Sequence, residues 1–156
     1  MVEAQELRRV MGHFATGVTV VTTHDGRGGA HGLTANSVTS VSLSPPLLLV
    51  CVDRKAESFA HFYASRCFAV NVLAATQEDL STRFARSGGD KFADVAHRAG
   101  RLGAPLLDGC LAHLECRIVQ THEGGDHVIH VGEVTHASAT GGDPLLYFQG
   151  RYRRLA

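Results

Sequence analysis

The chain has 156 residues, 44% of them apolar, so we expect a single domain over residues 1–156 with room for one core. Its 15 Lys and Arg residues balance 15 Asp and Glu residues, which argues against nucleic-acid or acidic-membrane partners and favours a small-molecule partner. No apolar run reaches the roughly 20 residues that cross a bilayer, and residues 1–9 lack the apolar stretch of a secretory signal, so a cytoplasmic location is expected.

The first third of the chain predicts one helix followed by strands. Four apolar residues have the spacing of one helical face: Leu7, Val10, Met11 and Phe14. The β-branched residues of 18–23 predict a strand, and the glycines of 26–29 predict a reversal into a second strand over 32–43. Two prolines then separate this strand from the apolar run 47–52, which predicts a buried strand.

The middle of the chain predicts two short helices on either side of a strand. Ser58 is expected to cap a helix that continues to Ser65, and residues 67–73 predict the strand. Thr76 and Asp79 have the spacing of a capping box, which predicts that the second helix begins there.

The last part of the chain predicts a loop followed by antiparallel strands. Residues 88–105 show no clear period, so we expect the least structured and most mobile loop there. Apolar and polar residues alternate over 112–118, and Gly124 with Gly125 predicts a turn into a strand over 127–134, before a final segment at 144–152. Six or more strands with hairpin connections and few short helices predict a mainly β fold, a closed or partly closed antiparallel barrel. No G-x-G-x-x-G stands between a strand and a helix, which argues against a Rossmann site.

One segment combines an unusual number of neutral hydrogen-bonding groups. Between residues 34 and 42 the sequence T-A-N-S-V-T-S-V-S carries five hydroxyls and one amide, just before the apolar run. Such groups can bind the polar edge of a flat heterocycle or a phosphate without any net charge. The alternative, an ordinary strand rich in Thr and Ser with hydroxyls facing water, stays open at this point.

Six motifs in order carry a family resemblance. They are T-G-V-T-V-V-T-T at 16–23, G-L-T-A-N-S at 32–37, S-L-S-P-P-L-L-L-V at 42–50, F-A-V-N-V-L at 68–73, G-D-H at 125–127 and G-R-Y at 150–152. This succession resembles the short-chain flavin reductase family, whose members have the FMN-binding split-barrel fold, and it covers nearly the whole chain. The stretches 79–86 and 90–92 are similar to the reductase components of two-component flavin monooxygenases in actinomycete aromatic polyketide pathways. One departure is Val38, where the family often has a bulky aromatic residue.

The resemblance implies a mainly β, antiparallel split β-barrel with a few short helices, and an NAD(P)H-dependent flavin reductase activity. Such an enzyme reduces FMN or FAD with NADH or NADPH and supplies the reduced flavin to a partner monooxygenase. Because the hydride passes directly between the two nucleotides, no catalytic acid, base or nucleophile is expected. A homodimer is also implied, to which the helix at 7–14 could contribute.

The resemblance places the flavin on thirteen residues: Thr34, Ala35, Asn36, Ser37, Ser40, Ser42, Cys51, Val52, Asp53, Lys55, Ser58, Arg86 and Lys91. Arg86, with Lys91 as a second candidate, would bring positive charge to the flavin phosphate, whereas the alternative for Arg86 is a solvated helix end. The nicotinamide is placed beside four residues: Gly125, Asp126, His127 and Tyr152. The alternative for His127 is a histidine bonded to backbone at the start of a strand.

No metal site is expected. His127 and His130 are three residues apart on a predicted strand, so their side chains point to opposite faces. The four cysteines show no C-x-x-C spacing and are expected to be reduced thiols. Two alternatives to the flavin reductase remain: a non-catalytic split-barrel module that binds flavin or haem, and a cupin-like metal enzyme that uses the histidines.

Overall fold

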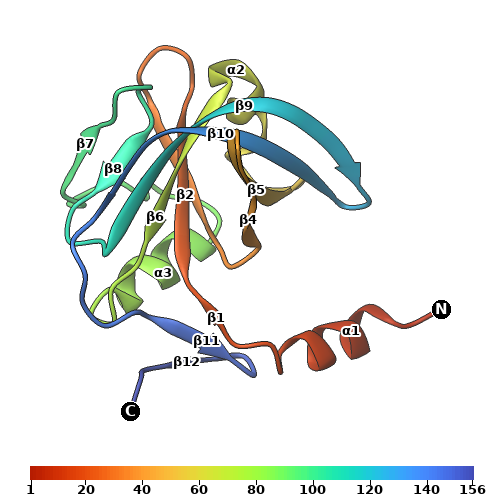
Figure 1. The fold of residues 1–156 in the computed structure, drawn as a ribbon. Helices are drawn as coiled ribbons and strands as arrows, with labels where there is room; N and C mark the ends of the chain where they lie inside the picture. The colour runs from red at the N-terminus through yellow and green to blue at the C-terminus, as the bar shows by residue number, and fades with distance from the viewer.

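The computed structural model describes all residues 1–156, and its main feature is a curled, antiparallel seven-stranded sheet (Figure 1). The strand order is β3-β2-β6-β9-β10-β5-β4. The strands are β2 (Thr19–His24), β3 (Ala30–Ala35), β4 (Val38–Leu43), β5 (Pro46–Asp53), β6 (Cys67–Val72), β9 (Ala112–Gly124) and β10 (His127–Ala139). Every pairing between neighbours is antiparallel, which confirms the predicted mainly β class.

The strand predicted over 32–43 is two strands, so that prediction is wrong at its centre. Asn36 and Ser37 separate β3 from β4, and these two strands form the opposite edges of the seven-stranded sheet. The sequence alone gives no break, because residues on both sides suit a strand. The chain must leave one edge and join the other, and it does so at these two residues, which we call the seam.

Two small sheets complete the fold. One contains β1 (Thr16–Gly17), β11 (Leu146–Phe148) and β12 (Arg151–Arg153), and it lies below the barrel in Figure 1. The other pairs β7 (His97–Ala99) with β8 (Pro105–Leu107). The expectation of an unstructured segment over 88–105 is therefore wrong in its second half, where β7 forms one side of a hairpin.

The barrel core is built by alternate residues of the strands. On β5 the side chains of Leu48, Val50 and Val52 are buried, whereas the intervening Leu47, Leu49 and Cys51 are only half-buried. The strand predicted over 47–52 is therefore present, and it is buried on one face only. Its outer face is free to line a binding site, while each fully buried side chain contributes about 1.5–3 kcal/mol to stability.

Three short helices surround the sheet: α1 (Ala4–Met11), α2 (Phe59–Ser65) and α3 (Glu78–Ala85). The predicted capping box is wrong, because Gln77 is the N-cap of α3 and its side-chain oxygen accepts a hydrogen bond from the Ala74 amide (2.9 Å). Ser58 stands at the N-cap of α2, yet its hydroxyl makes no capping bond. None of the helices has the length and apolar character that a membrane crossing needs.

Helix α1 extends away from the barrel (Figure 1). None of its residues is buried, and Leu7, Val10 and Met11 are 56%, 51% and 55% exposed. The predicted amphipathic helix is therefore present, but its apolar face has no cover within this chain.

Candidate active site at the seam of the barrel

The largest of the main cavities, about 560 Å³, lies where the seam meets α1 and the outer face of β4 and β5. We call it the seam groove. Asn36 and Ser37 line it from the seam, Thr39 and Cys51 line it from the two strands, and Phe14 lines it from the segment after α1. A cavity of this size is within the usual range for small-molecule sites, about 300–1,000 Å³.

A smaller cavity of about 170 Å³ adjoins the seam groove, and Asn36 and Tyr147 line both. Hydrogen bonds connect its walls: Thr34 Oγ1 donates to the Ser81 carbonyl (2.6 Å), and the hydroxyls of Ser81 and Tyr152 lie 2.6 Å apart. Asn36 and Ser37 keep the seam in place through side-chain bonds, from Asn36 Nδ2 to Thr16 Oγ1 (3.2 Å) and from Ser37 Oγ to the Cys51 carbonyl (3.2 Å). The T-A-N-S stretch therefore forms the common wall of two cavities.

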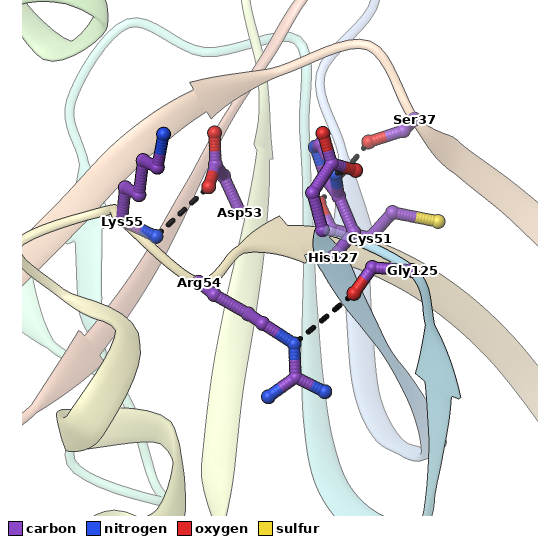
Figure 2. Close-up of polar contacts among 8 residues, drawn as sticks. Ser37, Cys51, Asp53, Arg54, Lys55, Gly125 and His127 are labelled. Carbon is purple, nitrogen blue, oxygen red and sulfur yellow. Dashed lines mark hydrogen bonds and ion pairs between the residues drawn. The ribbon is translucent and has the colours of Figure 1, made fainter.

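The turn between β9 and β10 lies beside the loop that follows β5. His127 is the register partner of Asp53, and Ile129 is the partner of Cys51, so the outer face of β5 continues onto β10. Figure 2 shows the side chains of Ser37, Cys51 and His127 drawn together with this loop. The predicted flavin and nicotinamide segments are therefore neighbours in space although about 70 residues separate Asp53 from Asp126 in the sequence.

Asp126 fixes the ring of His127. The Nδ1 of His127 lies 2.7 Å from the Asp126 carboxylate, and this hydrogen bond lowers the pKa of Asp126 below its usual range. A carboxylate at Nδ1 selects the tautomer with the proton on that nitrogen, so Nε2 is left as the free ring nitrogen. Lys55 and Asp53 lie opposite, with the Lys55 amide donating to the Asp53 carboxylate (2.8 Å).

The loop after α3 brings positive charge next to α2. Arg86 and Lys91 line a polar hollow of about 370 Å³, and Lys91 Nζ lies 3.8 Å from Glu57 Oε2. Glu57 also accepts a hydrogen bond from the Gly88 amide (2.7 Å), so this loop is attached immediately before Ser58. The Ser58 hydroxyl is buried and has no hydrogen-bond partner. A buried, unpartnered donor at this position is suited to an anionic oxygen from a ligand.

Some residues of the predicted site lie elsewhere. The Val52 side chain points into the core and is fully buried, so only its backbone is available to a ligand. Ser40 and Ser42 line neither the seam groove nor the smaller cavity, and the Ser42 hydroxyl accepts a hydrogen bond from the Ser44 amide. Tyr152 lines the smaller cavity, whereas His127 lines neither, so the structure does not bring these two predicted nicotinamide residues into one cavity.

The region also contains residues that were not among the predicted ones, and four of them show what the sequence could reveal. Thr16, Thr39 and Leu49 line the seam groove, and Arg54 joins the β5–α2 loop to the β9–β10 turn. The alternation of β5 could have indicated Leu49, since it shares a face with Cys51. Thr16 and Arg54 carry no such signal, because their roles depend on contacts with Asn36 and Gly125 far along the chain.

The cysteines and histidines do not form a second reactive centre. All four thiols are free, and burial raises the pKa of Cys110 to about 11 and that of Cys116 to about 12, which keeps both protonated. No group of three His, Cys, Asp or Glu side chains could hold a metal ion. His130 is fully buried while His127 is partly exposed, as their positions on opposite faces of β10 require.

Comparison with known proteins identifies relatives of this fold and site. Residues 11–156 match the family model described as a flavin reductase like domain. The chain is 48% identical over 157 residues to an NADH-dependent FAD reductase of Streptomyces globisporus, with 97% of this chain and 85% of that protein covered. It is 46% identical to the reductase component of a 4-nitrophenol 4-monooxygenase/4-nitrocatechol 2-monooxygenase of Rhodococcus opacus, covering 94% and 78%.

The solved structures agree with this relationship. An NADH:FAD oxidoreductase of Streptomyces globisporus, in complex with NAD and FAD fragments, superposes with a TM-score of 0.92 at 46% identity, covering 100% of this chain and 96% of that one. A longer relative, a probable flavin reductase of Rhizobium meliloti, is 46% identical, and this chain spans 48% of its length. The match to the family model extends over almost the entire chain, through the seam and the 125–127 turn, and the chain therefore belongs to the flavin reductase like domain family.

Proposed function

We propose that this protein is an NAD(P)H-dependent flavin reductase, an oxidoreductase that passes a hydride from NADH or NADPH to FMN or FAD. One observation carries the proposal: the outer face of β5, which lines the seam groove at Leu49 and Cys51, lies in register with the start of β10 at His127, in a chain of the flavin reductase family. NADH is the favoured donor, because the Streptomyces globisporus relative is named an NADH-dependent FAD reductase.

The residues present fit a flavin. The seam groove offers the neutral amide of Asn36 and the hydroxyl of Ser37 to the polar edge of the ring, and its size suits one flat heterocycle. Arg86, Lys91 and the unpartnered Ser58 hydroxyl supply the charge and the donor that a flavin phosphate needs. Asp53 and Lys55 follow Cys51 at the end of β5, and the Lys55 amide donates a hydrogen bond to the Asp53 carboxylate (Figure 2).

In this proposal the protein positions the flavin and nicotinamide rings relative to each other. A bound flavin supplies the hydride acceptor and the dihydronicotinamide supplies the hydride, so the chain needs only to hold the two rings in contact and to exclude water. His127, oriented by Asp126, offers its free Nε2 to the polar substituent of the nicotinamide. Tyr152 lies on the far side of Asn36, where its hydroxyl fixes Ser81 and the wall of the smaller cavity.

We further propose that the reduced flavin is used by a separate monooxygenase. The support is that the Rhodococcus opacus relative is the reductase component of such a system. The open seam groove agrees with a flavin that leaves after reduction, because its walls come from the surface of β4, β5 and α1.

A homodimer is part of the same proposal. The exposed apolar face of α1 lies against the seam groove, which is lined by Met11 and Phe14 together with strand residues. A second copy covering this face would bury the apolar residues of α1 and close the groove at the same time.

Purified protein mixed with NADH and FMN or FAD tests the proposal, by following the loss of nicotinamide absorbance. The expected result is NADH oxidation that requires added flavin, with saturation in both nucleotides. Flavin binding without NADH or NADPH oxidation would identify the non-catalytic module instead, and no affinity for any flavin would overturn the proposal outright.

A further inference from the structure

Arg54 connects the two halves of the proposed site through contacts that no other side chain makes. Its Nε donates to the Gly125 carbonyl (3.3 Å), and its guanidinium forms an ion pair with Glu123 (Figure 2 shows the bond to Gly125). Its backbone amide donates to the Asp126 carbonyl (3.1 Å). Arg54 thus contacts three residues at this end of the β9–β10 hairpin, Glu123 and Gly125 through its side chain and Asp126 through its backbone amide.

The β9–β10 turn needs these contacts from Arg54 because its own residues do little to restrict its conformation. Gly125 has φ of +73° and no atom lies within 4 Å of where its Cβ would be, so neither sterics nor packing restrains it. The residues from Thr121 to Asp126 are all exposed. Hairpin tips of this kind sample several conformations unless contacts from elsewhere select one.

The loop that carries Arg54 is better fixed than the turn. Ser58 is buried, and the loop closes with a backbone bond from the Ala56 amide to the Asp53 carbonyl (3.0 Å). The Arg54 guanidinium also lies over the ring of Phe59, 6.0 Å from its centroid, which limits its rotamers. Loss of the guanidinium therefore disturbs the turn more than the loop.

We infer that Arg54 is a positioning residue for the nicotinamide: its guanidinium holds the turn at Glu123 and Gly125 and so places Asp126, Asp126 holds His127, and His127 meets the nicotinamide ring. The inference rests on the proposed function and adds to it a determinant of nicotinamide affinity. Arg54 touches neither reacting atom. Its effect on the Michaelis constant for NADH passes through His127, so the test must include variants of both residues.

Arg54→Ala is expected to raise the Michaelis constant for NADH by about three- to tenfold, since it loosens a positioning turn, while the dissociation constant for flavin stays within about twofold. Arg54→Lys keeps a cation for Glu123 but lacks the Nε–H that reaches Gly125, so it is expected to recover only part of the loss. Steady-state kinetics and flavin fluorescence titration measure the two constants separately.

A double-mutant cycle with His127→Ala shows whether Arg54 acts through His127. In the His127→Ala background, Arg54→Ala is expected to have no further effect on the Michaelis constant for NADH. Additive effects would overturn the inference, as would an unchanged Michaelis constant for NADH or an equal weakening of flavin and NADH. Inactivity of the wild type with NADH, NADPH and flavin would instead remove the proposed function, and this inference with it.

The chain supplies a control ion pair on β9 and β10, the two strands that the turn connects. Arg117 on β9 pairs with Glu133 on β10 (2.9 Å), is also exposed, and makes no contact with the turn. Arg117→Ala removes an equivalent ion pair, and both nucleotide constants are expected to stay at wild-type values. A rise in the Michaelis constant for NADH in Arg117→Ala, as large as that in Arg54→Ala, would show a general effect of the hairpin and overturn the inference.

Discussion

Asn36, together with Tyr147, lines both cavities, and Asn36 is exposed at the seam between β3 and β4. Its only side-chain bond is the one to Thr16 Oγ1. The amide oxygen is left for a ligand, which makes Asn36 the most direct residue-scale probe of the seam groove.

Asn36→Phe is expected to weaken flavin binding by about tenfold or more, since an aromatic ring fills the groove and the amide is lost, which together exceed one hydrogen bond of about 1 kcal/mol. Fluorescence titration with FMN and FAD measures the change. Ser40→Phe introduces the same bulk on β4 outside both cavities and serves as the control. Equal loss of affinity in the two variants would contradict the placement of the flavin at the seam.

His130 is a second residue whose chemistry is set by its surroundings. It is fully buried, stacks on Phe62 with 5.4 Å between ring centroids, and leaves Nε2 without a partner. Burial, with a smaller contribution from the charge of Arg66, lowers the pKa of His130 to about 4. The folded state therefore requires the neutral imidazole.

Because the folded pKa lies below that of the unfolded chain, the unfolded state takes up the proton first and stability is lost as pH falls. Between pH 7 and pH 5 this group alone is expected to lower the free energy of unfolding by about 2 kcal/mol. Urea unfolding at both pH values measures it, and His130→Leu is expected to lose less stability over that interval than the wild type. An identical pH dependence in the variant would show that His130 does not contribute.

At the scale of elements, β10 allows close packing of the barrel core at Gly132. It pairs with β5 on one side and β9 on the other, and its register with β9 shifts between Val131 and Gly132. A Cβ on Gly132 would lie 2.7 Å from Cys116 Cβ and 2.7 Å from the Phe68 ring. The absence of a side chain there is what allows the Phe68 ring to fill the core.

Gly132→Ala is expected to lower the free energy of unfolding by about 1–3 kcal/mol, because the added methyl overpacks a fixed core. Gly17→Ala on β1 provides the comparison, since nothing lies within 4 Å of that added Cβ, and it is expected to change stability little. Denaturant unfolding of both variants gives the difference. An unchanged free energy of unfolding in Gly132→Ala would mean that the Phe68 ring can move aside without loss of stability, which would contradict the prediction.

At the scale of the whole molecule, the apolar face of α1 is the main apolar surface that no other part of the chain covers. Leu7 and Val10 are more than half exposed although the helix is strongly amphipathic. Apolar residues grouped on one exposed helix face mark an interaction surface. The proposed homodimer accounts for this face.

The double substitution Leu7→Asp with Val10→Asp is expected to shift the protein from dimer to monomer, because two charges cannot be buried in an apolar interface without partners. Light scattering after size-exclusion chromatography measures the mass. Gln5→Asp adds charge to the same helix outside the apolar spacing and is expected to leave the dimer intact. A double variant that remains dimeric at the same concentration would exclude α1 from the interface.

The sequence was enough for the fold class, the family and most strands, because alternation and glycine placement are local signals. It failed where a long-range contact decides the local structure. Residues 32–43 suit one strand throughout, yet Asn36 and Ser37 break it because β3 and β4 are opposite edges of one sheet. Thr76 and Asp79 have capping-box spacing, but the Gln77 side chain bonds the Ala74 amide instead.

In the candidate site, too, local sequence signals predicted some residues, whereas residues that depend on long-range contacts were missed. The motifs indicated Asn36, Ser37 and Cys51, and the structure brings these three into one groove. Ser40 and Ser42 are the same residue types in the same segment, but they lie further along β4 than Val38 and Thr39 and line neither cavity. Arg54 could not be distinguished from its neighbour Lys55, because its role depends on a turn more than 65 residues away.

The position of the seam has a thermodynamic consequence. The sheet begins and ends at strands that are adjacent along the chain, so Asn36 and Ser37 form the covalent link between its two margins. A nucleotide seated on Asn36 and Ser37 would contact both margins at once. Its binding energy would therefore oppose separation of the two margins, and saturating nucleotide would raise the free energy of unfolding.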